Sequence, residues 1–168
     1  MLSWPAADEV HVWSVDLGRP AAHLAGALSE DELLRVANFK VEDGRRRFVG
    51  TRAALRTLLG RYLDKDPGTL RFAASATGKP RLDPPSLLQF NVSHSGEVAM
   101  IAVTRERDVG VDVEQIKPRT HLDGVARRVF TAREREAIDG DPAFYRHWVA
   151  KEAFVKATGR GIASVKSF

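Results

Sequence analysis

The stretch VGVDVE, residues 109–114, decides how the rest of this sequence is interpreted. Its alternation predicts a β-strand, with the three valines on one face and Gly110, Asp112 and Glu114 on the other. The valine face is a core face. The opposite face would carry two neighbouring carboxylates, whose like charges repel unless something lies between them.

A divalent cation would remove that repulsion. Oxygen ligands without a nearby His or Cys suit a hard ion, Mg²⁺ before Ca²⁺. The alternative is an edge strand that shows its acidic residues to water, as edge strands do to avoid further pairing. Asp112 and Glu114 alone leave both interpretations open.

A helix expected over residues 144–161 offers a third carboxylate. Lys151 lies in its apolar stripe, and Glu152 and Lys156 lie on the border of that stripe. Glu152 could complete a Mg²⁺ site, and the two lysines would suit an anionic ligand of the metal. Alternatively, Glu152 and Lys156 form an i,i+4 ion pair and Lys151 extends to the surface.

Donors to phosphate form a further group. In NVSHS (91–95), Ser93 and His94 are adjacent on an expected strand, so they point apart and do not suit a Ser–His catalytic pair. They are either phosphate donors or turn residues that satisfy local backbone groups. Lys79 lies in a turn, and a long helix carries an arginine stripe that includes Arg52. Together these groups suit a ligand with more than one phosphate.

The periodicity of the whole chain predicts a mixed α+β fold, divided near residues 105–108. Residues 80–88 are expected to be an irregular connection. The expected strands cover residues 10–16, 70–72 and 109–114, with two more in 90–104 joined at 94–96. The expected helices cover residues 29–39, 43–63 and 122–129, a short helix capped by Thr131 and Glu134, and 142–159.

Composition excludes several classes of protein. The chain has 168 residues, 43% of them hydrophobic, and no long apolar run, so we expect no membrane span. It begins without a secretory signal pattern and has no cysteine, which fits a cytoplasmic protein. A net charge of +4 is compatible with nucleic acid, a phosphorylated cofactor or an acidic partner. We expect no nucleic-acid binding, because aromatic residues do not alternate with the basic ones.

Five motifs occur in an order and spacing that resemble the 4'-phosphopantetheinyl transferases of the surfactin-synthetase-activating (Sfp-like) type. They are GKP (78–80), FNVSHS (90–95), GVDVE (110–114), FTAREREAI (130–138) and WVAKEAFVKATGRGI (148–162). The resemblance runs from about Leu28 to the last residue, and its most specific part is GVDVE followed by WxxKExxxK.

This resemblance implies a fold of two similar α/β lobes and a Mg²⁺-dependent enzyme. The enzyme would move 4'-phosphopantetheine from coenzyme A to a serine of an apo acyl or peptidyl carrier protein, releasing 3',5'-ADP. Residues 1–105 would form the N-terminal lobe with coenzyme A-binding elements. Residues 106–168 would begin a C-terminal lobe, expected to be incomplete, with the Mg²⁺-binding strand and the WxxKExxxK helix.

The resemblance also implies roles for individual residues. The metal ligands would be Asp112, Glu114 and Glu152. Glu152 and Lys156 would be catalytic, with Glu152 accepting the serine proton directly or through a metal-bound water. The coenzyme A contacts would be Lys79, Ser93, His94, Lys151, Lys156 and, with a looser alignment, Arg52.

Two other functions use the same groups. A Mg²⁺-dependent phosphohydrolase of coenzyme A or nucleotides would replace the carrier serine by water. A non-catalytic binder of coenzyme A or carrier protein would bind without transfer. The sequence does not say which carrier protein is modified.

Overall fold

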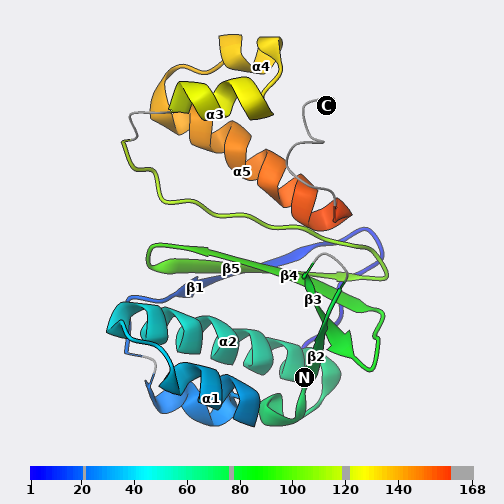
Figure 1. Cartoon of the computed structure of the whole chain (residues 1–168). Coiled ribbons are helices and arrows are strands. Elements are labelled where there is room, and N and C mark those ends of the chain that lie inside the picture. Colours follow the sequence, from blue (N-terminus) through cyan, green and yellow to red (C-terminus); the bar gives the residue numbers. More distant parts are fainter. Residues whose placement is uncertain (21, 76–77, 119–121, 160–168) are drawn as a thin grey trace.

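A three-stranded antiparallel sheet forms the centre of the fold, in the order β1–β5–β4 (Figure 1). The computed structural model describes residues 1–20, 22–75, 78–118 and 122–159. The strands are β1 (His11–Asp16), β4 (Leu88–Ser95) and β5 (Val98–Arg105). A tight turn joins β4 to β5 as predicted, and Gly96 in this turn has a φ of +57°.

Helices cover one face of this sheet. The main helix is α2 (Glu42–Leu63), with α1 (Glu30–Ala37) and the 3₁₀ helix η1 (Ala22–Ala27) beside it (Figure 1). The leucine stripe of α2 packs against alternate residues of β4 and β5, including Phe90, Ile101 and Val103. This core follows the two periodicities predicted from the sequence, 3.6 residues for the helix and 2 for the strands.

A second hairpin lies beside the C-terminal end of α2. The 3₁₀ helix η2 (Pro67–Thr69) leads into β2 (Arg71–Ala74), which pairs antiparallel with β3 (Pro80–Asp83). The predicted irregular connection over residues 80–88 is therefore wrong in its first half. Proline lowers strand propensity, and here Pro80 is the first residue of β3, a position where a strand tolerates it.

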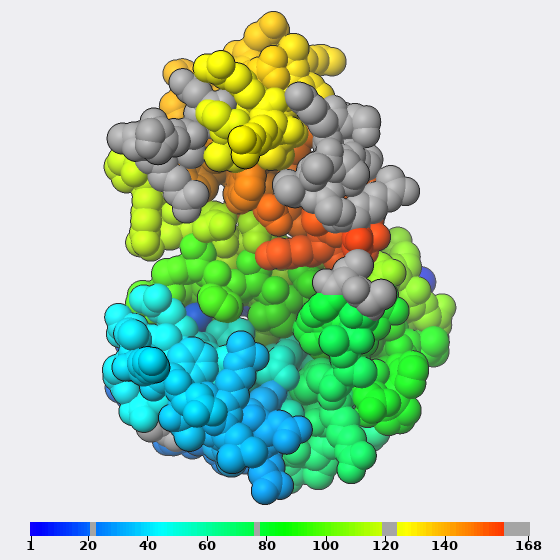
Figure 2. Space-filling view, viewed as in Figure 1, coloured from blue at the N-terminus to red at the C-terminus, as the bar shows by residue number. Residues whose placement is uncertain are grey.

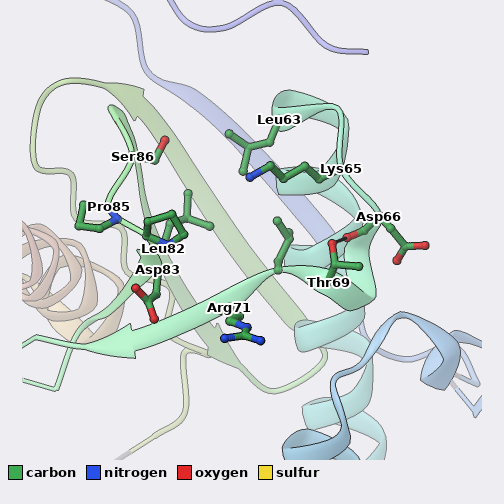
Figure 3. Close-up of a pocket in the computed structure, with 11 residues that line it drawn as sticks. Leu63, Lys65, Asp66, Thr69, Arg71, Leu82, Asp83, Pro85 and Ser86 are labelled. Carbon is green, nitrogen blue, oxygen red and sulfur yellow. Dashed lines mark hydrogen bonds between the residues drawn. The ribbon is translucent and has the colours of Figure 1, made fainter.

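An open groove of about 770 Å³ lies between this hairpin and the end of α2 (Figure 3). Lys65 and Arg71 line it together with Asp66 and Asp83, so both signs of charge are present. None of the described residues of the sequence motifs lines this groove.

The other face of the sheet is covered first by an extended segment, residues 109–118, which we call the acidic segment. Helix α5 (Gly140–Thr158) lies on top of this segment (Figure 1). Helices α3 (Leu122–Val129) and α4 (Ala132–Glu136) pack on α5, around Phe130 and Phe144. The Thr131–Glu134 capping box predicted for α4 is confirmed. In Figure 2 the orange and red atoms of α5 lie directly above the green atoms of the sheet and the segment.

The strand predicted for residues 109–114 is wrong. No residue from 109 to 118 belongs to a strand, although Val109 and Val111 are buried against Ala102 as their alternation predicted. The segment crosses the face of the sheet instead of pairing at its edge. Side chains of β4, rather than another backbone, bind its N–H groups, as described below.

No helix in the described part of the chain is long and apolar enough to cross a membrane.

Candidate functional site

The site is built on three alternate residues of β4 that point away from α2. Asn91, Ser93 and Ser95 accept hydrogen bonds from the backbone N–H groups of residues 111, 113 and 115, at 2.9, 3.4 and 3.0 Å. Each bond joins residues 20 apart in the sequence. Strand β4 and the segment therefore run side by side, with every second residue of the strand bound to every second residue of the segment. We call these three bonds the β4 side-chain ladder.

The same serines bind the two carboxylates of the segment. The Ser93 hydroxyl donates to Asp112 Oδ1 at 2.7 Å, and the Ser95 hydroxyl donates to Glu114 Oε2 at 2.9 Å. Each of the two serine hydroxyls thus binds a backbone N–H group of the segment and also orients one of its carboxylates.

Helix α5 closes the site from the other side. A Cβ atom added to Gly110 would lie 1.8 Å from the carbonyl oxygen of Ala153, so only glycine allows this approach of segment to helix. One turn along α5, Lys156 Nζ donates to Asp112 Oδ1 at 2.6 Å and to Ser93 Oγ at 3.0 Å. Ser93, Asp112 and Lys156, which lie far apart in the sequence, meet here.

The three acidic residues interact electrostatically. Burial raises the pKa of Glu152, the charge of Asp112 raises it further, Lys156 opposes the shift, and Glu114 adds a smaller increase. The side chain of Asp112 is only 5% exposed, and its Oδ2 atom is buried without a hydrogen-bond partner in the described part of the chain. A buried carboxylate oxygen without a partner is costly, and a bound cation would offset that cost.

The donor set fits a hard divalent cation, but the carboxylates are not gathered around one point. Among the described residues, no three Asp, Glu, His or Cys side chains are close enough to hold a metal ion together. Asp112 offers its free oxygen, Glu152 lies within electrostatic reach, and Glu114 is held by Ser95. A metal at these three residues stays a prediction.

Lys79 lies at the start of the segment. Its ammonium donates to the carbonyl oxygen of Val109 at 2.8 Å and pairs with Asp108 at 3.4 Å, and its side chain is 10% exposed. Lys79 thus ties the turn after β2 to the beginning of the acidic segment. Its role as a coenzyme A contact stays a prediction. Residues 160–162, the end of the WVAKEAFVKATGRGI motif, lie outside the described residues.

Lys151 is buried and pairs with a carboxylate of helix α4. It is 6% exposed, pairs with Glu134 at 3.0 Å and lies 5.8 Å from the ring centre of Phe130. The alternative in which Lys151 extends to the surface is therefore wrong. This buried pair joins α5 to α4, and the predicted contact with the pyrophosphate stays untested.

Arg52 also has a partner elsewhere. Arg52 and Arg56 both bind the carboxylate of Glu32 and lie over the ring of Phe72, at 4.8 and 5.1 Å from its centre. Burial acts to raise the pKa of Glu32, but the two arginines and the N–H of Ser29 lower it below its usual value. Glu32 therefore joins α1 to α2, and coenzyme A binding by Arg52 stays a prediction.

His94 and Ser93 lie on opposite faces of β4. Ser93 is buried in the site, whereas His94 is exposed and pairs in register with Ala99 of the α2 face. The prediction that these two residues do not form a catalytic pair is confirmed by this geometry. The predicted contact of His94 with coenzyme A is not tested.

Sequence reasoning missed three residues of the site: Asn91, Ser95 and Gly110. A signal for the first two was present, because polar residues at 91, 93 and 95 alternate with apolar Phe90 and Val92. For Gly110, no signal in the sequence distinguishes a close approach of helix and segment from a turn.

Two family models match consecutive parts of the chain. Residues 18–106 match the model described as "4'-phosphopantetheinyl transferase, N-terminal". Residues 108–168 match the "4'-phosphopantetheinyl transferase superfamily" model. The chain belongs to the 4'-phosphopantetheinyl transferase family.

Individual relatives carry the same name. The chain is 41% identical to the 4'-phosphopantetheinyl transferase HetI of Nostoc sp., over 95% of this chain and 72% of that protein. It is 36% identical to a putative 4'-phosphopantetheinyl transferase of Synechocystis sp., over 90% of this chain and 65% of that protein. Identity to a 4'-phosphopantetheinyl transferase of Bacillus subtilis is 29%, over 90% of this chain and 71% of that protein.

Proposed function

We propose that this protein is a Mg²⁺-dependent 4'-phosphopantetheinyl transferase of the Sfp-like type. It would transfer phosphopantetheine from coenzyme A to a serine of an apo acyl or peptidyl carrier protein in the cytoplasm, releasing 3',5'-ADP. The observation that carries the proposal is the meeting of Ser93, Asp112 and Lys156 beside Glu152. Family membership and the names of the relatives support the same reaction.

Coenzyme A brings a pyrophosphate and a 3'-phosphate, so the site must hold several negative charges. Mg²⁺, held by Asp112, Glu114 and Glu152, would neutralise charge on the pyrophosphate and on the phosphoryl group under attack. Lys156 already lies at Asp112 and would contribute a fixed cation beside it. The Ser93 hydroxyl, next to both, would donate to a phosphate oxygen.

Glu152 suits the role of proton acceptor for the carrier serine. Its carboxylate lies within electrostatic reach of Asp112 and Lys156, so a carrier serine bound beside them could pass its proton to Glu152. The serine oxygen would then attack the phosphorus that bears the pantetheine arm, and the bond to the 3',5'-ADP oxygen would break.

The direct test is mass spectrometry of apo carrier proteins incubated with this chain, coenzyme A and MgCl₂. We expect a mass gain of one phosphopantetheine on the carrier serine and no gain in EDTA. Loss of coenzyme A at the same rate without any carrier would instead indicate a phosphohydrolase. Coenzyme A binding without transfer to any acyl or peptidyl carrier would contradict the proposed activity.

A further inference from the structure

No residue of the motif FTAREREAI (130–138) takes part in the reaction as proposed above. In the structure, two of its side chains contact Lys151 of α5. Glu134 Oε2 lies 3.0 Å from the Lys151 ammonium. The fully buried ring of Phe130 has its centre 5.8 Å from the same ammonium, within the range of a cation–π contact. Two separate motifs of the sequence therefore meet at one buried lysine.

Glu134 is held in place by its own helix. Its Oε2 accepts the N–H and the hydroxyl of Thr131 at 2.7 and 3.0 Å, in the capping box of α4. Burial acts to raise the pKa of Glu134, but the Thr131 N–H and Lys151 lower it below its usual value, so the group is an anion at neutral pH. Phe130, Thr131 and Glu134 thus offer a ring and a fixed anion to a buried ammonium, and we call them the Lys151 socket.

The socket holds one face of α5. Phe144, Trp148 and Lys151 follow at spacings of four and three residues, so they lie on the same face of the helix. Phe144 and Trp148 pack in the apolar cluster around Phe130. Apolar packing has no preferred direction, whereas a hydrogen-bonded ion pair has a preferred distance and angle. The pair with Glu134 therefore restricts the rotation of α5 about its own axis.

A second face of α5 carries the groups of the site. It lies against Gly110 of the acidic segment, and Lys156 on this side binds Asp112 at 2.6 Å. Glu152, the proposed proton acceptor, directly follows Lys151 in the helix. A rotation that takes Lys151 out of its socket must therefore also move Glu152.

We propose that Lys151 is a positioning residue, which acts through Glu134 to fix the rotation of α5 that presents Glu152 to the site. The inference rests on the proposed function for the reaction itself. It goes beyond that function by giving the FTAREREAI motif a task, and by replacing the contact of Lys151 with the pyrophosphate that the family resemblance implies.

The test separates a positioning role from a phosphate contact. Calorimetry with coenzyme A gives the Kd, and transfer to an apo carrier domain gives kcat, for the parent protein, Lys151→Met and Glu134→Gln. Both variants should keep the parent Kd, while kcat falls about 10- to 100-fold because the reacting groups are displaced. Lys156→Met, which removes an ammonium of the proposed phosphate site, should instead weaken coenzyme A binding about 10-fold or more.

A double variant tests the ion pair without any ligand. Glu134→Gln keeps an acceptor for Thr131 but leaves the buried Lys151 without this counter-charge, which should lower the urea midpoint strongly. Adding Lys151→Met removes the buried charge, so the double variant should have a higher midpoint than Glu134→Gln alone. Glu106→Gln is the matched control, because it breaks an exposed pair with Arg105 and should leave the midpoint unchanged.

Three results would overturn the proposal. They are coenzyme A binding weakened by Lys151→Met as much as by Lys156→Met, a parent-like kcat in Lys151→Met, and a double variant less stable than Glu134→Gln. Carrier modification by the parent sample judges the proposed function separately. An inactive parent would reject that function and the positioning role with it, while the urea midpoints would still judge the ion pair.

Discussion

For single residues, the main feature of the site is that its charged side chains are buried or half-buried. The Asp112 side chain is buried, with one oxygen bound to Lys156 and the other without a partner among the described residues, and Glu152 is half-buried beside it. Such an arrangement is unfavourable for an isolated folded chain and becomes favourable when a cation binds. A carboxyl group whose pKa is raised by burial and by a neighbouring acid, as for Glu152, is typical of functional sites.

Replacing Glu152 by Gln tests the proposed base. The amide keeps the shape of the side chain but cannot accept the serine proton, so we expect kcat to fall about 100-fold or more. Coenzyme A binding should change much less, because its phosphates would keep Lys156 and Ser93. Steady-state transfer kinetics and calorimetric titration with coenzyme A measure the two effects. Near-normal kcat would reject the assignment of Glu152.

The turn between β4 and β5 supplies a prediction about pH. Hydrogen bonds from Arg46 and Arg47 lower the pKa of Glu97 from 4.5 to about 2. Because the folded pKa lies below the unfolded one, this ionised group stabilises the fold above about pH 4.5, and the contribution is lost as pH falls toward 2.

Urea unfolding of the protein and of Glu97→Gln across this pH range is the measurement. The parent should have the higher midpoint near pH 6, and the difference should shrink steadily as pH falls from about 5 to about 2. Asp43 pairs with the same two arginines, so Asp43→Asn, measured in the same way, separates its contribution from that of Glu97. A constant difference over this range would contradict the predicted linkage.

At the scale of elements, an unpaired segment lies between a sheet and a helix. Its N–H groups are satisfied by the side chains of β4, which replace the strand partner it lacks. Its other side contacts α5 at Gly110, without a side chain between the two backbones. The side chains of Asn91, Ser93 and Ser95 therefore set the distance from the sheet to the segment. Gly110 sets the distance from the segment to α5.

Gly110→Ala should push α5 away from the segment. The new Cβ would lie 1.8 Å from Ala153 O and 2.5 Å from Ala157 N, so backbone must move. Overpacking of this kind costs about 1–3 kcal/mol or more in the free energy of unfolding. Urea unfolding measures the loss, and Mn²⁺ binding should weaken with it.

Gly124→Ala is the control for this substitution. Gly124 lies in α3 with nothing within 4 Å of an added Cβ, so helix propensity alone should raise stability by up to about 1 kcal/mol. Equal behaviour of the two variants would show that the contact at Gly110 is not tight.

At the scale of the whole molecule, the site joins two parts of the chain. The first family match ends at residue 106, and the second begins at residue 108, just before the acidic segment. Ser93 belongs to the first part, whereas Asp112 and Lys156 belong to the second. A cation bound here would be linked to both, so its binding should stabilise their association.

Mg²⁺ should therefore raise the melting temperature. At a concentration about 100 times its Kd, a ligand of the folded state adds about 2.7 kcal/mol, or about 5–10 °C for a chain of this size. Differential scanning calorimetry with MgCl₂ or EDTA measures the shift. Asp112→Asn should largely abolish it, and a shift of equal size in that variant would place the cation elsewhere.

The sequence by itself determined the elements and the kind of chemistry. Periodicity predicted α2, β4, β5 and α3 and the capping box of α4, because burial of one face imposes a regular spacing on local segments. The ordered motifs predicted the family, because residues that bind phosphate and metal recur at fixed places in a fold.

The tertiary structure alone decided how these residues meet. It showed that residues 109–114 are held by serine and asparagine side chains rather than by a strand, and that Lys151 and Arg52 pair with Glu134 and Glu32. A local pattern records which face of a segment is buried, but not what lies against that face. Partners 20 to 63 residues away are chosen by packing, which no local spacing encodes.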